Sequence, residues 1–313
     1  MQMKIKYTMM ALCLLLTAGC SIEKGEETAP EASIVLSIDG IGQQADTRAA
    51  VLGWADTPVS VAYAEEGYDY TNFFDVTVTA ASGIHVNTGM SYPVGNVPIR
   101  FVGYHPTAVP AGAGTVAYGI TDGDVDVMVS NEISGKATEP IGEGTNTDKL
   151  VFEHKLTCIT FSMKCSSDTE SYPELVRGVT VAASTAAPLN TQAVLDLSTR
   201  AVSFEMPGTV LAGDRAGFRV PAFTEEPIVI DVLVQPGVPL SFKVRTTTDE
   251  KAITITNNDA LWTSLQENGG EAGKRYLVNL EFSAISIHKY ENVFLVDWQQ
   301  GSNLNGDNPG AWW

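Results

Sequence analysis

The sequence predicts an all-β protein built from β-sandwiches. Many short segments alternate apolar and polar residues, which is the period expected of a strand with one buried face. Turns that contain glycine or proline separate these segments, and no long segment keeps the roughly 3.6-residue apolar period of an amphipathic helix. Because the chain has 313 residues, it is long enough to form two domains, each with its own core.

Residues 1–20 resemble a bacterial lipoprotein signal. Lys4 and Lys6 precede an apolar run that is too short to remain as a membrane-spanning helix. The run leads into small residues and then Cys20, where such a signal is cleaved and the cysteine is acylated. We therefore predict that Cys20 becomes the first residue and carries the lipid that anchors the chain to a membrane. An ordinary secretion signal that happens to end in cysteine is the alternative.

A tether and one short strand are predicted next. Residues 21–31 include four glutamates and are too polar to pack into a core. The strand that follows places Ile34, Leu36 and Ile38 on one face, as in a half-buried strand. Two glycines end the alternation, and a polar stretch then leads to an isolated arginine, Arg48.

More strands of this kind are predicted through the first half of the chain. The segment 97–104 is apolar on both faces, so we expect it in the middle of a sheet. The glycine- and asparagine-rich turn at 141–146 is predicted to separate an N-terminal sandwich, 49–147, from a C-terminal sandwich, 148–313. The other strands predicted before this turn are 59–63, 74–78 and 125–129.

The second half repeats the pattern. The apolar residues change parity between 150 and 163, so the strand there is predicted to bulge or break near Thr157. A hairpin is predicted around the turn Ser198-Thr199-Arg200, although this turn lacks the favoured Asn-Gly chemistry. Further strands are predicted at 228–234 and 276–282.

Two cysteines, Cys158 and Cys165, lie beyond the signal. On one extended strand they would be roughly 23 Å apart, whereas a disulfide requires Cα atoms within about 7 Å. We therefore predict two buried or half-buried thiols. A turn between them would still allow a bridge.

No constellation of residues in the sequence supports catalysis. The four histidines lie outside the known metal-ligand pair motifs, and neither a nucleophile elbow nor a phosphate-binding glycine loop occurs. His154 shares a face with Phe152 and Leu156, so a hydrogen-bonded core histidine is predicted. We therefore predict neither an enzyme nor a bound cofactor. A formal charge of -18 also argues against nucleic acid as a partner, because its phosphates would be repelled.

Asp122, Asp124 and Asp126 are spaced like the start of a calcium-binding loop. The glycine that should follow the third acidic position is replaced by Val127, which alternates with the acids as in a strand. A strand with a solvated polar face is therefore predicted, and no metal site.

The last residues contain an apolar segment followed by tryptophans. Val293, Leu295 and Trp298 are candidates for a strand that pairs with the sheet of another chain. The same segment is equally consistent with the last core strand of its own domain. Sugar binding by tryptophans at the end of the chain is a weaker third interpretation.

Six short phrases, taken in order, resemble the fimbrillin family of Bacteroidales lipoproteins, the subunits of protease-assembled pili. Each phrase is degenerate, so the resemblance depends on their order along nearly the whole chain. They are the lipoprotein site at Cys20; Thr47-Arg48-Ala49 before Trp54; Pro98-Ile99-Arg100-Phe101-Val102-Gly103-Tyr104-His105-Pro106; Asp126-Val127-Met128; Phe152-Glu153-His154-Lys155-Leu156; and Ala272-Gly273-Lys274-Arg275-Tyr276.

The resemblance implies two transthyretin-like β-sandwich domains in tandem and a function in polymerisation and adhesion. A lipidated precursor would reach the outer membrane, where an arginine-specific protease would cut after Arg48 and make Ala49 the new N-terminus. The propeptide, 21–48, would then leave with its strand, 33–39. A strand from another pilus subunit would fill the resulting groove at the cell surface.

The resemblance leaves the position in the pilus open among shaft, tip and anchor. Segment 293–296 is apolar on both faces, so it is not a clean alternating donor strand. The alternative function is a surface adhesin that does not polymerise and binds a host or bacterial glycan or protein. Trp262, Trp312 and Trp313 are the candidate aromatic platforms for a glycan.

Overall fold

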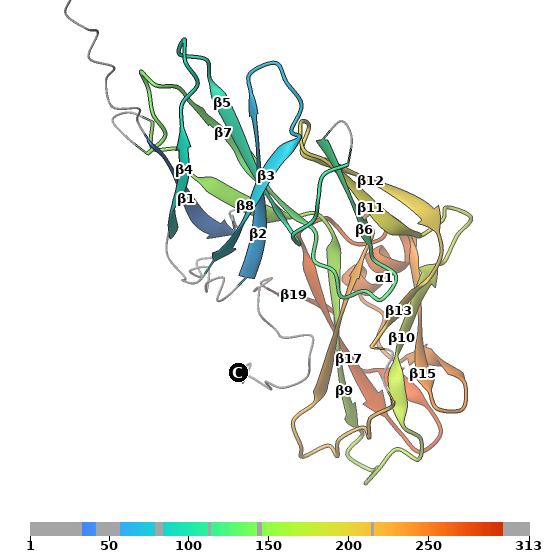
Figure 1. Ribbon diagram of the computed structural model, residues 1–313. Coiled ribbons are helices and arrows are strands. Elements are labelled where there is room, and N and C mark those ends of the chain that lie inside the picture. Colours follow the sequence, from blue (N-terminus) through green and yellow to red (C-terminus); the bar gives the residue numbers. More distant parts are fainter. Residues whose placement is uncertain are drawn as a thin grey trace, which may run out of the picture. The chain divides into compact units, whose positions relative to one another are not determined.

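Strands make up nearly all the regular structure of the computed structural model (Figure 1), which confirms the predicted all-β class. The structure describes residues 33–41, 57–78, 84–111, 114–142, 146–213 and 216–296. These residues belong to one unit, Ala32–Trp313. The predictions for Cys20, Arg48, Ala49, Trp298, Trp312 and Trp313 lie outside the described residues.

The first sheet has seven strands in the order β3-β2-β5-β7-β8-β1-β4. β5 lies between β2 and β7, as the apolar residues on both of its faces predicted. The strands of this sheet are β1 (Ser33–Ile41), β2 (Thr57–Glu65), β3 (Asn72–Val78), β4 (Ile84–Ser91), β5 (Ile99–His105), β7 (Met128–Gly135) and β8 (Leu150–His154).

One face of this sheet forms a buried core. The apolar residues of β1 pack there with residues of β2, β5 and β8. Gly103 of β5 allows a close approach, because a Cβ atom at this position would lie 2.3 Å from Cζ of Phe152 on β8. The register of β5 against β7 shifts between Val102 and Tyr104, on either side of this glycine.

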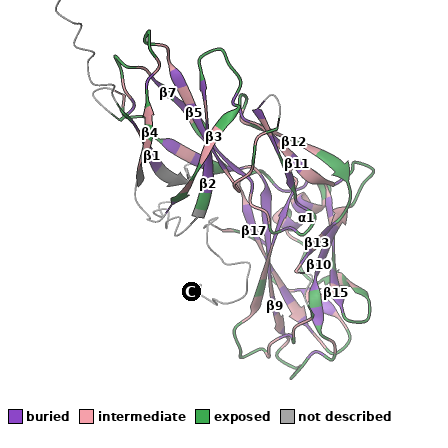
Figure 2. Cartoon of the chain, viewed as in Figure 1, coloured by how far each residue is buried: buried purple, intermediate pink, exposed green. Residues whose placement is uncertain are grey.

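The second half of the chain forms a separate core. Its main path of strands runs β13-β10-β15-β16-β18-β17-β9-β14, and β19 pairs with β17 beside this path. Buried residues run along β9 and β17 (Figure 2), the parallel pair at the centre of this core. The elements are β9 (Thr157–Cys165), β10 (Val176–Ala183), β13 (Val210–Ala212), β14 (Ile228–Val234), β15 (Leu240–Thr246), β16 (Glu250–Ile255), α1 (Ala260–Glu267), β17 (Arg275–Phe282), β18 (Ile287–Lys289) and β19 (Phe294–Val296).

A third, three-stranded sheet combines strands from both halves of the chain. β11 (Asn190–Asp196) pairs with β12 (Ala201–Pro207), as the predicted hairpin requires, and on its other side with β6 (Thr115–Gly119). A third buried cluster lies here and includes Tyr104, Leu156 and Leu195. β12 is exposed along much of its length (Figure 2).

The chain passes from the first sheet to the second core where a strand break was predicted. β8 ends at His154 and β9 begins at Thr157, so the change of apolar parity reflects a real interruption. β8 pairs with β7 and β1 of the first sheet. The predicted division into domains at 147 and 148 stays a prediction.

One local prediction was wrong, and a helix was missed. The strand predicted at 125–129 begins only at Met128, and the residues from Asp122 to Val127 form a turn, a bend and an irregular segment. The helix α1 was not predicted, since its eight residues are too short to show a sustained period. It buries Trp262 and Leu265, three positions apart on one face, and Asp259 caps its N-terminus.

Cys158 and Cys165 lie on β9 as buried thiols that are not joined by a disulfide, as predicted. Burial raises the pKa of both thiols, which makes their thiolates less available. Within the described ranges, no helix has the length and apolar character needed to cross a membrane.

Candidate functional site

β1 has a neighbouring strand on each side. It pairs antiparallel with β4, where Leu36 faces Val86, and parallel with β8, where Ile38 faces Leu150. The Thr88 hydroxyl of β4 also donates a hydrogen bond to the carbonyl of Ile34 at 2.9 Å. Removal of β1 would therefore leave unpaired backbone groups on two strands, whereas removal of an edge strand leaves them on one.

The apolar face of β1 is part of the first core. Ile34 and Leu36 are 0% exposed and Ile38 is 1% exposed. Burying three side chains of this size stabilises a fold by about 4.5 to 9 kcal/mol in total. Ser37, on the opposite face, is also buried, so β1 is covered on both faces near its centre. The residues that β1 covers would form an apolar trough if it left.

β4, the antiparallel partner of β1, was not predicted. The alternation of Ile84, Val86 and Met90 is the signal that would have found it. Val86 and Met90 are half-buried and pack against the same core as β1. The site for β1 is thus built from strands that lie after it in the sequence, on both sides.

The exposure of side chains in the C-terminal candidate segment changes sharply from one residue to the next. Val293 is 4% exposed and belongs to the second core, whereas Leu295 is 51% exposed. β19 pairs with β17 at three positions, from Arg275 opposite Val296 to Leu277 opposite Phe294. The predicted donor residues Val293 and Leu295 therefore lie in different environments.

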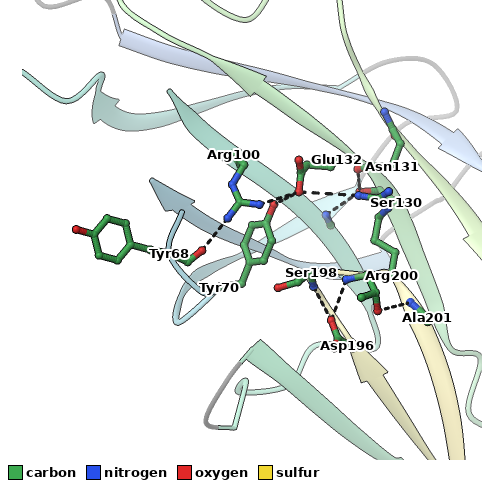
Figure 3. Close-up of polar contacts among 12 residues, drawn as sticks. Tyr68, Tyr70, Arg100, Ser130, Asn131, Glu132, Asp196, Ser198, Arg200 and Ala201 are labelled. Atoms are coloured by element: carbon green, nitrogen blue, oxygen red, sulfur yellow. Dashed lines mark hydrogen bonds and ion pairs between the residues drawn. The ribbon is translucent and has the colours of Figure 1, made fainter. Parts of the chain in front are cut away.

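A group of polar side chains connects the first sheet to the β11–β12 turn (Figure 3). Glu132 of β7 accepts a hydrogen bond from the Tyr70 hydroxyl at 2.6 Å and one from Arg100 of β5 at 3.3 Å. Arg200 of the turn lies 3.9 Å from the same carboxylate oxygen. Arg100 also donates to the carbonyl of Tyr68 at 2.7 Å, and its guanidinium carbon lies 5.0 Å from the Tyr70 ring centre. The group holds these elements together through hydrogen bonds and ion pairs.

The electrostatics of this group keep Tyr70 as a neutral donor. Burial raises the pKa of its hydroxyl, and the Glu132 carboxylate raises it further. Asp196 shapes the turn that presents Arg200, because its side chain accepts hydrogen bonds from the backbone of Ser198 and Thr199, each at 2.8 Å. Sequence reasoning missed the group, because its members come from separate elements and share no local pattern.

The structure shows the surroundings of the histidine and aspartate residues that the sequence singled out. Nδ1 of His154 lies 2.9 Å from an Asp126 carboxylate oxygen, so the prediction of a hydrogen-bonded core histidine is confirmed. Asp122 and Asp124 are exposed. Where the structure describes the chain, no group of three or more histidine, cysteine, aspartate or glutamate side chains is arranged to hold a metal ion.

The one described tryptophan that was proposed as a sugar platform is buried. Trp262 is 1% exposed in the second core, so the prediction that it forms an exposed platform was wrong. A hollow of about 310 Å³ is lined by Pro98, Ser134, Gly135, Lys136, Glu139, Asn146 and Asp148 and has no aromatic side chain among these residues. The platform proposed at Trp312 and Trp313 stays a prediction.

The fold and the two candidate segments define a class of protein. It is an all-β chain with a buried strand near its start, β1, and a short, partly exposed strand, β19, after its second core. A model of the fimbrillin-like family matches residues 45–298, so the chain belongs to the fimbrillin-like family. This membership gives it a pilus or adhesin type of role at the cell surface and makes it a structural protein and not an enzyme. The resemblance found in the sequence is confirmed. A comparison with curated proteins gave no match.

Solved structures share the fold. A putative cell adhesion protein from Bacteroides uniformis is 15% identical with a TM-score of 0.55, and the match covers 85% of this chain and 98% of that one. Another from Bacteroides ovatus is 17% identical with a TM-score of 0.51, covering 85% and 97%. A third, from Parabacteroides distasonis, is 12% identical with a TM-score of 0.50, covering 86% and 98%.

Proposed function

We propose that this chain is a structural pilus subunit that assembles by strand exchange after proteolysis. A lipid on Cys20 delivers the precursor to the outer membrane, and an arginine-specific protease cuts between Arg48 and Ala49. β1 then leaves, and an extended strand from another subunit takes its place. The observation that carries this proposal is the position of β1 between β4 and β8, with Ile34, Leu36 and Ile38 buried.

The two-sided pairing of β1 supports exchange by physical reasoning. Loss of an edge strand exposes one row of backbone groups, but loss of β1 would expose a row on β4 and another on β8. Only another extended chain can pair with both rows and fill the apolar trough with alternate side chains. The C-terminal segment that contains Leu295 is the proposed donor, and Trp298 would extend it.

Electrostatics favour apolar burial as the basis of the contact between subunits. The cleaved subunit, residues 49–313, would carry 15 basic and 31 acidic residues and a formal charge of -16, so identical subunits repel each other at long range. This repulsion is screened beyond roughly 8 Å at physiological ionic strength. Strand pairing and burial of apolar side chains therefore have to supply the affinity.

A disulfide that locks β1 in place tests the proposal. Leu36 and Val86 face each other on antiparallel strands, where Cα atoms lie roughly 4.5 to 5.5 Å apart, within the range for a disulfide. The variant Leu36→Cys/Val86→Cys should assemble into high-molecular-mass ladders when reduced. The same protein should remain monomeric after oxidation, although the protease still cuts it.

A matched disulfide separates this effect from oxidation itself. Val194 and Ser203 face each other on β11 and β12, away from β1. The variant Val194→Cys/Ser203→Cys should assemble equally well when oxidised or reduced. If the oxidised β1 lock assembles as well as this control, exchange of β1 is not the mechanism. Mass spectrometry of the native surface protein gives a second check, because a mature species that still begins at lipidated Cys20 would also contradict the proposal.

A further inference from the structure

Lys289, at the end of β18, is a fully buried cation. Its side chain is 0% exposed, and its Nζ lies 2.8 Å from a carboxylate oxygen of Asp259. Nζ also donates to the carbonyl of Glu291 at 2.7 Å and to the carbonyl of Asn257. It lies 5.8 Å from the ring centre of Trp262. A buried ammonium group needs such partners, because removing its charge from water is costly.

Asp259 links this cation to two backbone segments. One carboxylate oxygen accepts hydrogen bonds from the backbone of Leu261 at 3.0 Å and Trp262 at 2.9 Å, which caps α1. The other oxygen, which faces Lys289, also accepts a hydrogen bond from the backbone N–H of Val293 at 3.1 Å. The Asp259–Lys289 pair therefore holds the chain at Glu291 and Val293 against the start of the helix.

The contacts made by the Asp259–Lys289 pair end at Val293. Phe294 is 46% exposed and Leu295 is 51% exposed, whereas Val293 is part of the core. The three residues of β19 pair with β17 alone among the described strands. A short edge strand with exposed side chains contributes little to stability and opens readily. The structure thus places a firmly held residue next to a weakly held strand.

We propose that the Asp259–Lys289 pair is an anchor that fixes the chain through Val293, so that the C-terminal segment separates from its own domain between Val293 and Phe294. This inference rests on the proposed function in one respect, because it names the part of the donor segment that is able to leave. Val293 then stays with its domain and is not a donor residue. Leu295 becomes the first apolar residue of the donor pattern whose side chain is already exposed.

Hydrogen–deuterium exchange of the uncleaved full-length chain, read at single residues by fragmentation mass spectrometry, tests the anchor. The amide of Val293 should exchange at least about tenfold more slowly than the average of Phe294, Leu295 and Val296, because only the former requires opening of the anchor. Equal protection across these four residues would overturn the inference. This measurement needs no variant and no assembly.

Lys289→Met tests the role of the pair directly. Methionine keeps much of the apolar length of lysine without its charge, and the other oxygen of Asp259 keeps its hydrogen bonds from the backbone of Leu261 and Trp262. Exchange at Val293 should rise at least about tenfold, while exchange at Trp262 changes less than about threefold. Lys243→Met is the matched control, because Lys243 forms an ion pair with Glu250 at an exposed site on β15. Unchanged exchange at Val293 in Lys289→Met would overturn the inference.

The two proposals fail in different ways. The exchange measurement concerns the separated subunit, so an anchored Val293 beside a loosely held β19 would stand even if the chain never polymerised. Conversely, uniform protection from Val293 to Val296 would remove the anchor inference and leave exchange of β1 untouched, because the β1 lock reports on that step separately.

Discussion

Truncation of one side chain on β1 should destabilise the precursor and leave the cleaved subunit unchanged. Leu36 is 0% exposed and lies at the centre of the strand, opposite Val86. Leu36→Ala removes a buried side chain and leaves a cavity, which costs about 2 to 5 kcal/mol in a well-packed core. The strand pairing on both sides should limit collapse of the site, because the backbone of β1 stays paired with β4 and β8 in the variant.

The same cost of about 2 to 5 kcal/mol predicts how Leu36→Ala affects the release of β1 after cleavage. If the cost applies to the bound strand, the equilibrium for dissociation of β1 rises by about 30-fold to several thousand-fold, since each 1.4 kcal/mol is about tenfold. Cleaved protein from which β1 has left should be identical in the wild type and the variant. The effect is therefore specific to the precursor.

The assay is hydrogen–deuterium exchange at the amides of β2 and β5, whose side chains pack in the same core as β1. These amides report the opening free energy of the first core separately from the second. Ser33→Ala, at an exposed position of the same strand, is the control and should change this free energy by less than about 0.5 kcal/mol. If Leu36→Ala matches Ser33→Ala, the argument that β1 completes the first core is wrong.

Two further predictions concern polar groups. Tyr70→Phe removes the hydrogen bond to Glu132 and should lower the free energy of unfolding by about 1 to 2 kcal/mol; urea unfolding measures this, and an unchanged midpoint would contradict it. Burial alone raises the pKa of Asp259, but hydrogen bonds from Lys289 and from the backbone of Trp262 and Val293 outweigh it and hold the pKa below its usual value. The stabilisation is therefore complete above the unfolded-state pKa of about 3.9 and is lost as the pH falls through the folded-state value. Exchange at Val293, corrected for the intrinsic pH dependence, should be constant from pH 7 to about 5 and accelerate in stronger acid; constant protection into stronger acid would refute this assignment.

The placement of β1 connects the stability of the precursor with the proposed strand exchange. An edge strand is easily replaced because it has one neighbour, but its loss costs little. β1 has two neighbours and three buried apolar side chains, so the precursor is stable while the strand is present. Proteolysis would provide the trigger, because a cut in the connection after β1 makes its departure from the sheet a separate dissociation step.

Periodic local signals identified most of the strands. The alternation of Ile34, Leu36 and Ile38 located β1, and the parity change near Thr157 located the interruption between β8 and β9. These predictions succeeded because a strand with a buried face imposes a two-residue period on its own sequence. α1 was not predicted, because two turns of helix contain too few positions to display a helical period.

The sequence by itself determined the all-β class, the apolar face of β1, the two buried thiols and the membership of the fimbrillin-like family. Each of these depends on the order of residues within a short segment or on the order of several such segments. Tertiary structure alone decided that β1 lies between β4 and β8, that Glu132 joins Tyr70, Arg100 and Arg200, and that Lys289 meets Asp259. These contacts bring together residues far apart in the chain, and their pairing depends on sheet order and register, which the period of a single strand does not specify.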